Sequence, residues 1–156
     1  MAGLAVFAAI LWAVWYYLYP RLSGEVVSST AQAEVCLVSP DARDGWSRAT
    51  SLAKRTLYRS PQTILTTREL TTFRGFYRVE SVGPATPVLT LHLTAEGAER
   101  LRALQAEASN EMLGLIIHGT LVGTLPLTER IEDTIEFELQ GVSRDDAEQA
   151  FARLTQ

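Results

Sequence analysis

Cysteine and histidine are scarce in this sequence. Its 156 residues include one cysteine, Cys36, and two histidines, His92 and His118. A single cysteine cannot form an internal disulfide or a cysteine-rich metal site, so the folded part of the chain must be stabilised by buried apolar side chains. Cys36 lies within residues 34–38, whose composition is typical of a β-strand. We therefore expect a small buried thiol there, and not a reactive or lipid-bearing one.

Metal-binding and catalytic patterns are also missing. Neither histidine belongs to an HExxH-type pair, and the two are far apart in the sequence. Acidic residues pair at expected turns and helix starts, where carboxylates mostly act as caps; these pairs are Asp41 with Asp44, Glu132 with Asp133, and Asp145 with Asp146. Gly114, Gly119 and Gly123 have the spacing of a hairpin and lack the Lys-Ser/Thr of a phosphate-binding loop. The sequence thus predicts no enzyme activity, no metal and no cofactor.

An excess of positive charge is likewise absent. The net charge is −4, from 14 Lys and Arg against 18 Asp and Glu, and the two signs are mixed along the chain. Nucleic-acid binding needs a basic stripe, so we expect no nucleic-acid partner. The densest basic stretch is expected to be a solvated helix face, with contact to anionic headgroups or to an acidic partner as the alternative. It consists of Arg43, Arg48, Lys54, Arg55 and Arg59.

Charge of either sign is absent from residues 1–20, because every Lys, Arg, Asp and Glu lies at position 21 or beyond. Residues 2–19 are apolar or aromatic, and at the helical rise they would extend about 27 Å, close to the thickness of the hydrocarbon layer. We therefore predict a transmembrane anchor over residues 1–20. Its aromatic residues gather toward the C-terminal end, where such rings settle at the headgroup interface, and we predict that they contact a partner. They are Trp12, Trp15, Tyr16, Tyr17 and Tyr19.

A cleaved signal peptide is the alternative for this segment, since Ala31-Gln32-Ala33 offers a small-x-small cleavage site. No Lys or Arg precedes the apolar run, and both Arg21 and Glu25 lie between the run and the site. These features favour an uncleaved anchor. The flanking charges do not decide its orientation in the membrane.

The rest of the chain divides into a linker, residues 21–33, and one domain, residues 34–156. In the first half of the domain the expected elements are a strand over 34–38, a helix whose core-facing residues are Trp46, Ala49, Leu52 and Ala53, a break at 58–61, a short helix with a capping box of Thr66 and Glu69, and a strand over 76–82.

The second half of the domain has the clearest periodicity. Leu89, Leu91 and Leu93 share one face of a predicted strand, and Val88, Thr90 and His92 share the other. The predicted order is a strand over 88–93, a helix over 95–109, a hairpin of 113–117 and 121–125, a strand over 135–139 and a helix over 143–154. This order predicts an α+β domain, an antiparallel sheet with its helices on one face.

Four segments carry a family resemblance: residues 63–70, 87–101, 113–126 and 141–150. Together they resemble the first periplasmic domain of SecD, a subunit of the bacterial protein-export machinery. The most distinctive motif is a strand that ends in Leu93-Thr94 before Glu96-Gly97-Ala98, since glycine in the first turn of a helix is disfavoured.

The resemblance implies a ferredoxin-like head on the periplasmic side of the bacterial inner membrane, in contact with extended polypeptide. SecD has further membrane helices with acidic residues, which this sequence lacks, so energy-coupled transport is not implied. We hypothesise a non-catalytic, single-pass accessory subunit that binds integral membrane protein subunits, in an export complex or in an energy-transducing one. The alternative is a free-standing, membrane-tethered module that binds peptides or preproteins at a sheet edge.

Overall fold

The computed structural model of the chain describes residues 24–79, 83–108, 110–128 and 131–156. The predicted anchor, residues 1–20, lies outside these ranges, and so do its five aromatic residues Trp12, Trp15, Tyr16, Tyr17 and Tyr19. Within the described ranges, no helix is both long enough and apolar enough to cross a bilayer.

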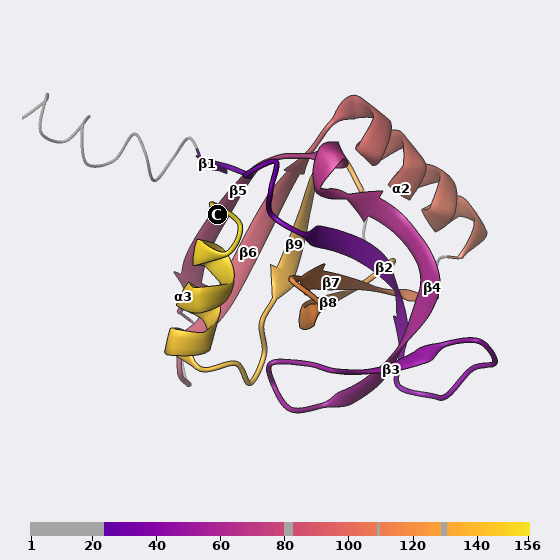
Figure 1. The fold of residues 1–156 in the computed structure, drawn as a ribbon, viewed down its shortest axis with the longest axis horizontal. Coiled ribbons are helices and arrows are strands. Elements are labelled where there is room, and N and C mark those ends of the chain that lie inside the picture. Colours follow the sequence, from indigo (N-terminus) through magenta and orange to yellow (C-terminus); the bar gives the residue numbers. More distant parts are fainter. Residues whose placement is uncertain (1–23, 80–82, 109, 129–130) are drawn as a thin grey trace, which may run out of the picture.

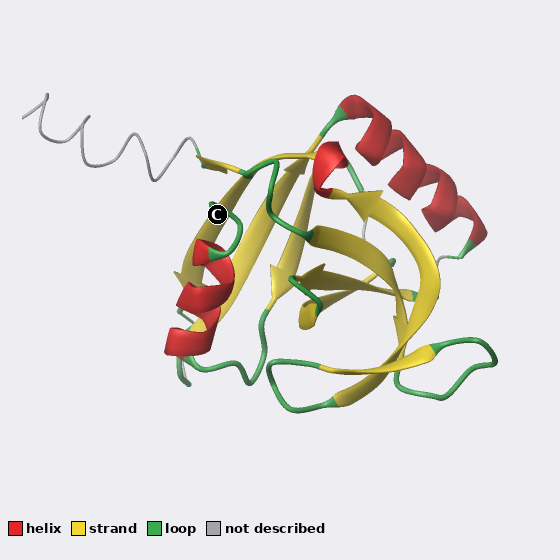
Figure 2. Ribbon diagram, in the orientation of Figure 1, coloured by secondary structure: helices red, strands yellow, loops and turns green. Residues whose placement is uncertain are grey.

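Strands dominate the described part of the chain, with two α-helices and one 3₁₀ turn (Figure 1; Figure 2). In the first half the elements are β1 (Glu25–Val26), β2 (Ala33–Ser39), β3 (Ser47–Thr50), β4 (Thr56–Thr66), the 3₁₀ turn η1 (Thr67–Glu69) and β5 (Leu70–Arg78). In the second half they are β6 (Thr86–Leu93), α2 (Ala95–Glu107), β7 (Met112–Ile117), β8 (Thr120–Pro126), β9 (Thr134–Glu138) and α3 (Arg144–Ala152). The predicted α+β class is confirmed.

All nine strands belong to one sheet, in the order β1-β5-β6-β9-β8-β7-β2-β4-β3. Neighbouring strands are antiparallel throughout, as predicted. The order of elements along the chain from β6 to α3 also matches the prediction. The ferredoxin-like arrangement implied by the resemblance does not describe this sheet, because residues 24–66 add four strands, two of which form its edges.

The helix predicted around residues 46–53 is wrong, because this stretch forms β3 and the turn into β4. Ala49 pairs with Leu57, and both pack into a small second core with Cys36, Val38, Ile116 and Leu121. The spacing of the apolar residues in this stretch suits a helix as well as a strand. The strand is favoured because it packs Ala49 and its partner Leu57 into this second core. The turn is closed by a hydrogen bond from the Lys54 amide to the carbonyl oxygen of Ser51, at 2.8 Å.

A break was predicted at residues 58–61, but β4 continues through them. Cys36 of β2 pairs with Thr63, whereas Val38 pairs with Arg59, so β4 carries two extra residues between these pairs. Pro61 lies in this bulge and is exposed. A proline is tolerated at a bulge because no ladder hydrogen bond is required of its nitrogen.

The strand predicted at residues 76–82 begins earlier, since β5 follows η1 directly at Leu70 and ends at Arg78. The short helix predicted at Thr66 and Glu69 is confirmed as η1, with both hydrogen bonds of the capping box present. In β6 the predicted alternation holds from Leu89 to Leu93, where the three leucines are buried and Thr90 and His92 are half-buried. Val88, predicted to share the face of Thr90 and His92, is 0% exposed.

Residues 24–33 are part of the fold, although the sequence predicted a linker over residues 21–33. β1 pairs with β5, and the amide of Ser28 donates to the carbonyl oxygen of Leu154 at 2.8 Å. Three small apolar side chains of this segment are buried: Val27, Ala31 and Ala33. The small residues that suggested a flexible tether instead let the backbone pass close to the core.

The β7–β8 hairpin turns at His118 and Gly119, as predicted. Their φ angles are +48° and +77°. A two-residue turn of type I′ requires positive φ at both central positions, which glycine adopts without steric cost. His118 is thereby placed at an exposed loop tip.

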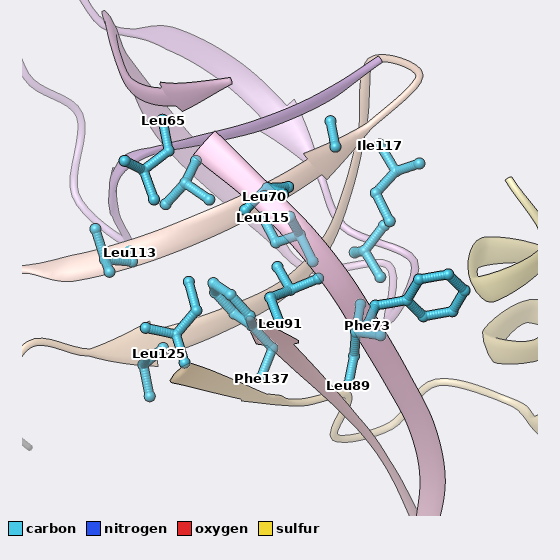
Figure 3. Close-up of a cluster of buried hydrophobic side chains, with 14 of the residues drawn as sticks. Leu65, Leu70, Phe73, Leu89, Leu91, Leu113, Leu115, Ile117, Leu125 and Phe137 are labelled. Atoms are coloured by element: carbon cyan, nitrogen blue, oxygen red, sulfur yellow. The ribbon is translucent and has the colours of Figure 1, made fainter. Parts of the chain in front are cut away.

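The single β8–β9 residue pair divides the sheet into two halves, β1-β5-β6-β9 and β8-β7-β2-β4-β3. One main core lies between these halves (Figure 3). Leu113, Leu115 and Leu125 of β7 and β8 gather there with Leu91 and Phe137 of β6 and β9. Both helices contribute to the same core, α2 through Ala98 and Leu101 and α3 through Ala147, Ala150 and Leu154 just beyond it. The two helices thus pack on the face that encloses this core, as predicted.

We predict that Leu101→Ala destabilises the domain by about 2–5 kcal/mol, because Leu101 is 0% exposed in this core. Leu104, on the next turn of α2, is half-buried, and Leu104→Ala should cost less. Urea unfolding followed by circular dichroism measures both values. Equal destabilisation by the two substitutions would contradict this packing.

Candidate functional site

A groove of about 810 Å³ opens on the sheet where β8 and β9 meet. Its lining comes from the tip of the β3–β4 hairpin, from β8 and from the end of β9. Arg55, Arg78, Glu136 and Glu138 supply charge to its lining, and Leu57, Val122, Leu125 and Leu139 supply apolar surface. The groove therefore combines apolar surface with charges of both signs.

The groove exists because β8 and β9 scarcely pair. Their ladder contains one residue pair, Thr124 with Glu138, whereas β6 and β9 share five. Elsewhere on β8 the hairpin tip takes the place of a neighbouring strand, since the amide of Leu52 donates to the carbonyl oxygen of Leu121 at 3.0 Å. The groove thus lies between separating strand edges, a setting that suits an extended polypeptide.

Arg78 gives the groove a charged wall. From β5 it reaches across β6 on the face away from the main core and forms ion pairs with both Glu136 and Glu138 of β9. These side chains are 39% to 41% exposed, so solvent screens the pairs and each contributes little stability. Weak, exposed pairs can exchange partners with the charged side chains of a bound peptide.

Sequence reasoning did not identify this site. The alternation along residues 135–139 already placed Glu136 and Glu138 on the polar face of a strand. Their pairing with Arg78 depends on β5, β6 and β9 lying side by side, and a local sequence pattern does not contain that adjacency.

The two histidines and the acidic pairs singled out in the sequence lie apart from the groove, whereas Arg55 of the basic stretch lines it. His92 is half-buried on β6, and His118 is at the hairpin tip. Asp146 belongs to a helix cap, as predicted, because its amide donates to the Ser143 hydroxyl oxygen at 3.2 Å. Within the ranges that the structure describes, no three His, Cys, Asp or Glu side chains come close enough to hold a metal ion.

The Glu-Gly-Ala motif marks a close contact between η1 and the start of α2. A Cβ added at Gly97 would lie 3.1 Å from the carbonyl oxygen of Glu69 and 3.0 Å from its Cβ. The amide of Thr94 also donates to that carbonyl oxygen, at 2.8 Å, and the Thr94 hydroxyl caps the helix by accepting from the Gly97 amide. This close approach favours glycine at position 97 despite its low helix propensity, because a Cβ there would be crowded by Glu69.

The carboxylate of Glu69 ties three elements together. It accepts hydrogen bonds from the Thr66 amide at 2.7 Å and the Thr66 hydroxyl at 2.8 Å, and it lies 3.5 Å from the guanidinium of Arg100 on α2. Burial raises the pKa of Glu69, but these hydrogen bonds and the charge of Arg100 outweigh that effect and hold the pKa below its usual value. Its ionised form therefore stabilises the fold.

Cys36 is a buried strand residue, as predicted, with 2% of its surface exposed. Burial raises the pKa of its thiol to about 11, while the nearby Arg59 opposes this and Glu34 adds to it. The thiol is consequently neutral at physiological pH, and a neutral buried thiol is a poor nucleophile.

No family model and no curated protein matches the chain, but two solved structures share its fold. The crystal structure of SecDF in its super-membrane-facing form has 16% sequence identity and a TM-score of 0.56, over 79% of this chain and 18% of SecDF. A second SecDF structure, described as a membrane component that enhances protein export, has 15% identity and a TM-score of 0.54, over 83% of this chain and 63% of that one. The chain thus spans less than two thirds of either structure's length. The likeness concerns the fold, which is SecD-like, in agreement with the resemblance in sequence.

We predict that Glu69→Gln lowers stability at pH 7 by about 0.5–2 kcal/mol, the range for a lost helix cap. Because the folded-state pKa is lowered, this contribution is present above the unfolded-state pKa and is lost as pH falls through the folded-state value. The difference in Tm between the two proteins should therefore shrink between pH 7 and about pH 3. Glu99→Gln, at an exposed position of α2, is the matched control. A difference in Tm that stays constant with pH would contradict this assignment.

We also predict that Cys36 reacts with iodoacetamide at pH 8 far more slowly in the folded protein than in urea. Because its folded-state pKa is raised to about 11, the unfolded state ionises first, and stability should fall as pH rises from about 8.5 toward 11. Cys36→Ala should remove the part of this loss of stability at alkaline pH that comes from ionisation of the thiol. Equally rapid labelling of the folded and unfolded protein would overturn the burial of this thiol.

Proposed function

We propose that the chain is a non-catalytic accessory subunit of a membrane-bound protein-export complex, and that its domain binds extended polypeptide outside the cytoplasm. The observation that carries this proposal is the fold shared with SecDF over 79% to 83% of the chain, since one of those structures is described as enhancing protein export. Fold alone does not define function, so the proposal also depends on the groove.

The groove at the β8–β9 junction is the proposed polypeptide site. Separated strand edges offer backbone hydrogen-bonding groups, which recognise any extended chain regardless of its sequence. Arg78, Glu136 and Glu138 add charges of both signs beside apolar Leu57 and Leu125. A site of this mixed character suits a succession of different segments better than one fixed ligand.

The membrane attachment rests on the sequence. Residues 2–19 are proposed to anchor the chain in a bacterial inner membrane, with the domain on the periplasmic side. Trp12, Trp15, Tyr16, Tyr17 and Tyr19 are proposed to contact integral membrane subunits, because large aromatic side chains with a polar handle suit contacts that span lipid and headgroup.

The absence of catalysis is part of the same proposal. The carboxylates with a lowered pKa have structural partners: Glu69 bonds to Thr66, and Glu148 bonds to Arg144 and Tyr77. Groups held in caps and ion pairs of this kind stabilise local structure, and each of these carboxylates lies apart from the groove lining.

Site-specific photo-crosslinking tests the groove. A photoreactive amino acid at Gln140, on the groove lining, should form adducts with exported polypeptide when the full chain is produced in its own membrane. The same residue at Glu99, on the exposed side of α2, is the control and should form few. Arg78→Ala should lower the adduct yield at Gln140, because it leaves two glutamates unpaired in the groove wall. Equal yields at Gln140 and Glu99 would refute the groove as the site.

Purification in mild detergent tests the accessory role. Recovery with a stoichiometric integral membrane partner supports it, and the partner's identity distinguishes an export complex from an energy-transducing one. Exchange of residues 2–19 for an unrelated apolar span of equal length should abolish this recovery while the domain still folds. Recovery of the chain alone would instead favour a free-standing peptide-binding module.

A further inference from the structure

Residues 45–68 contain no acidic side chain, although acidic residues outnumber basic ones in the chain as a whole. The same stretch holds five basic residues: Arg48, Lys54, Arg55, Arg59 and Arg68. It coincides with β3, the turn at its tip and β4, so the local excess of positive charge lies on one hairpin. We refer to residues 47–66 as the basic hairpin.

Among the described residues, the charges of the basic hairpin have no acidic partner. Arg48, Lys54 and Arg55 are exposed, Arg59 is half-buried, and none of the four forms an ion pair with a described residue. By contrast Arg43, Arg78, Arg100 and Arg144 all pair with glutamates of the domain. The hairpin therefore presents positive charge that the fold itself does not neutralise.

The basic hairpin also carries a strand edge. β3 is the last strand in the order of the sheet, and among the described residues β4 is the only strand that pairs with it. In Figure 1 this edge lies far from β1, where the described chain begins at residue 24. Along Ser47–Thr50 this edge has no second partner strand in the part of the chain that the structure describes, and it ends at Ser51, which forms an isolated parallel bridge with Leu121 of β8. These four residues offer backbone donors and acceptors to an incoming strand.

The basic side chains of the hairpin lie on both of its faces, Arg48 on the edge strand β3 and Arg59 on β4. Arg48 shares a face with Thr56, to whose hydroxyl it donates a hydrogen bond at 3.2 Å. Arg59 pairs with Ser47 and lies on the opposite face, which also carries Ala49 and Leu57. An added strand directs alternate side chains to the two faces, so the acidic residues on one face would lie beside Arg48 of β3. Arg59 is one strand further in, on β4, and adds positive charge on the other face.

We propose that the β3 edge of the basic hairpin docks an extended acidic segment of a partner protein by strand addition. Anionic lipid headgroups fit less well as the ligand. A membrane surface attracts basic side chains but does not form backbone hydrogen bonds with a strand edge. A single charged residue on an edge strand already protects it against aggregation. Such protection does not explain why residues 45–68 contain five basic and no acidic side chains. This docking site goes beyond the polypeptide groove, and the two can be tested apart.

Fluorescence anisotropy with the full chain in detergent tests the docking site. The probe is a short labelled peptide in which glutamate alternates with threonine and valine. We expect the peptide to bind, and to bind more weakly as salt is added. Its affinity should fall about tenfold when the chain carries Arg48→Glu. Arg102→Glu, at an exposed position of α2, makes the same change in net charge and should alter the affinity by less than about twofold.

Two further probes separate strand addition from simple attraction of charge. The same peptide with alternate backbone nitrogens methylated keeps its glutamates but cannot pair with β3, and it should bind weakly. Arg48→Gln, which leaves no reversed charge, should give an intermediate affinity with an unchanged Tm.

Three results would overturn the proposal: equal binding of the methylated peptide, equal loss with Arg102→Glu, or binding to phosphatidylglycerol vesicles but not to the peptide. The photo-crosslinks at Gln140 report on the groove, so they would persist if only the docking site failed.

Discussion

The apolar core between the two halves of the sheet is the constraint on which the rest of the structure depends. No disulfide is available to join the halves, and the β8–β9 ladder contributes one residue pair. Leu115 and Leu125 on one side and Leu91 and Phe137 on the other must therefore hold the halves together by burial. The helices complete the enclosure, and the contact of Gly97 with Glu69 sets how closely α2 approaches.

The weak ladder that makes the core necessary also creates the groove. Where β8 and β9 separate, the sheet gains a concave surface whose apolar lining, Val122, Leu125 and Leu139, also belongs to the main core. The basic hairpin completes one wall of this groove with its tip and leaves its outer edge to solvent. One sheet thus presents two separate strand-like surfaces that differ in charge: the groove is mixed and the hairpin edge is positive.

Local sequence patterns predicted the second half of the domain because its periods are regular and its turns carry specific residues. His118 and Gly119 mark their hairpin, and Thr94 and Ser143 mark their helix starts. In the first half the patterns failed at Ala49, where packing into the second core favoured β3 over a helix, and at Pro61, where an exposed bulge lets β4 continue through a proline. The groove could not be predicted, because its charged wall joins Arg78 to residues of a strand that is distant in sequence.

The attachment of residues 24–33 has a mechanical consequence. A pulling force applied at residue 24 acts first on the two residue pairs of β1 and then on the bond between Ser28 and Leu154. Next come Ala31 and Ala33, which the hydroxyl of Thr67 holds against η1. Few bonds resist at the start, so under load β1 would detach first, whereas further extension would also withdraw Val27, Ala31 and Ala33 from the main core.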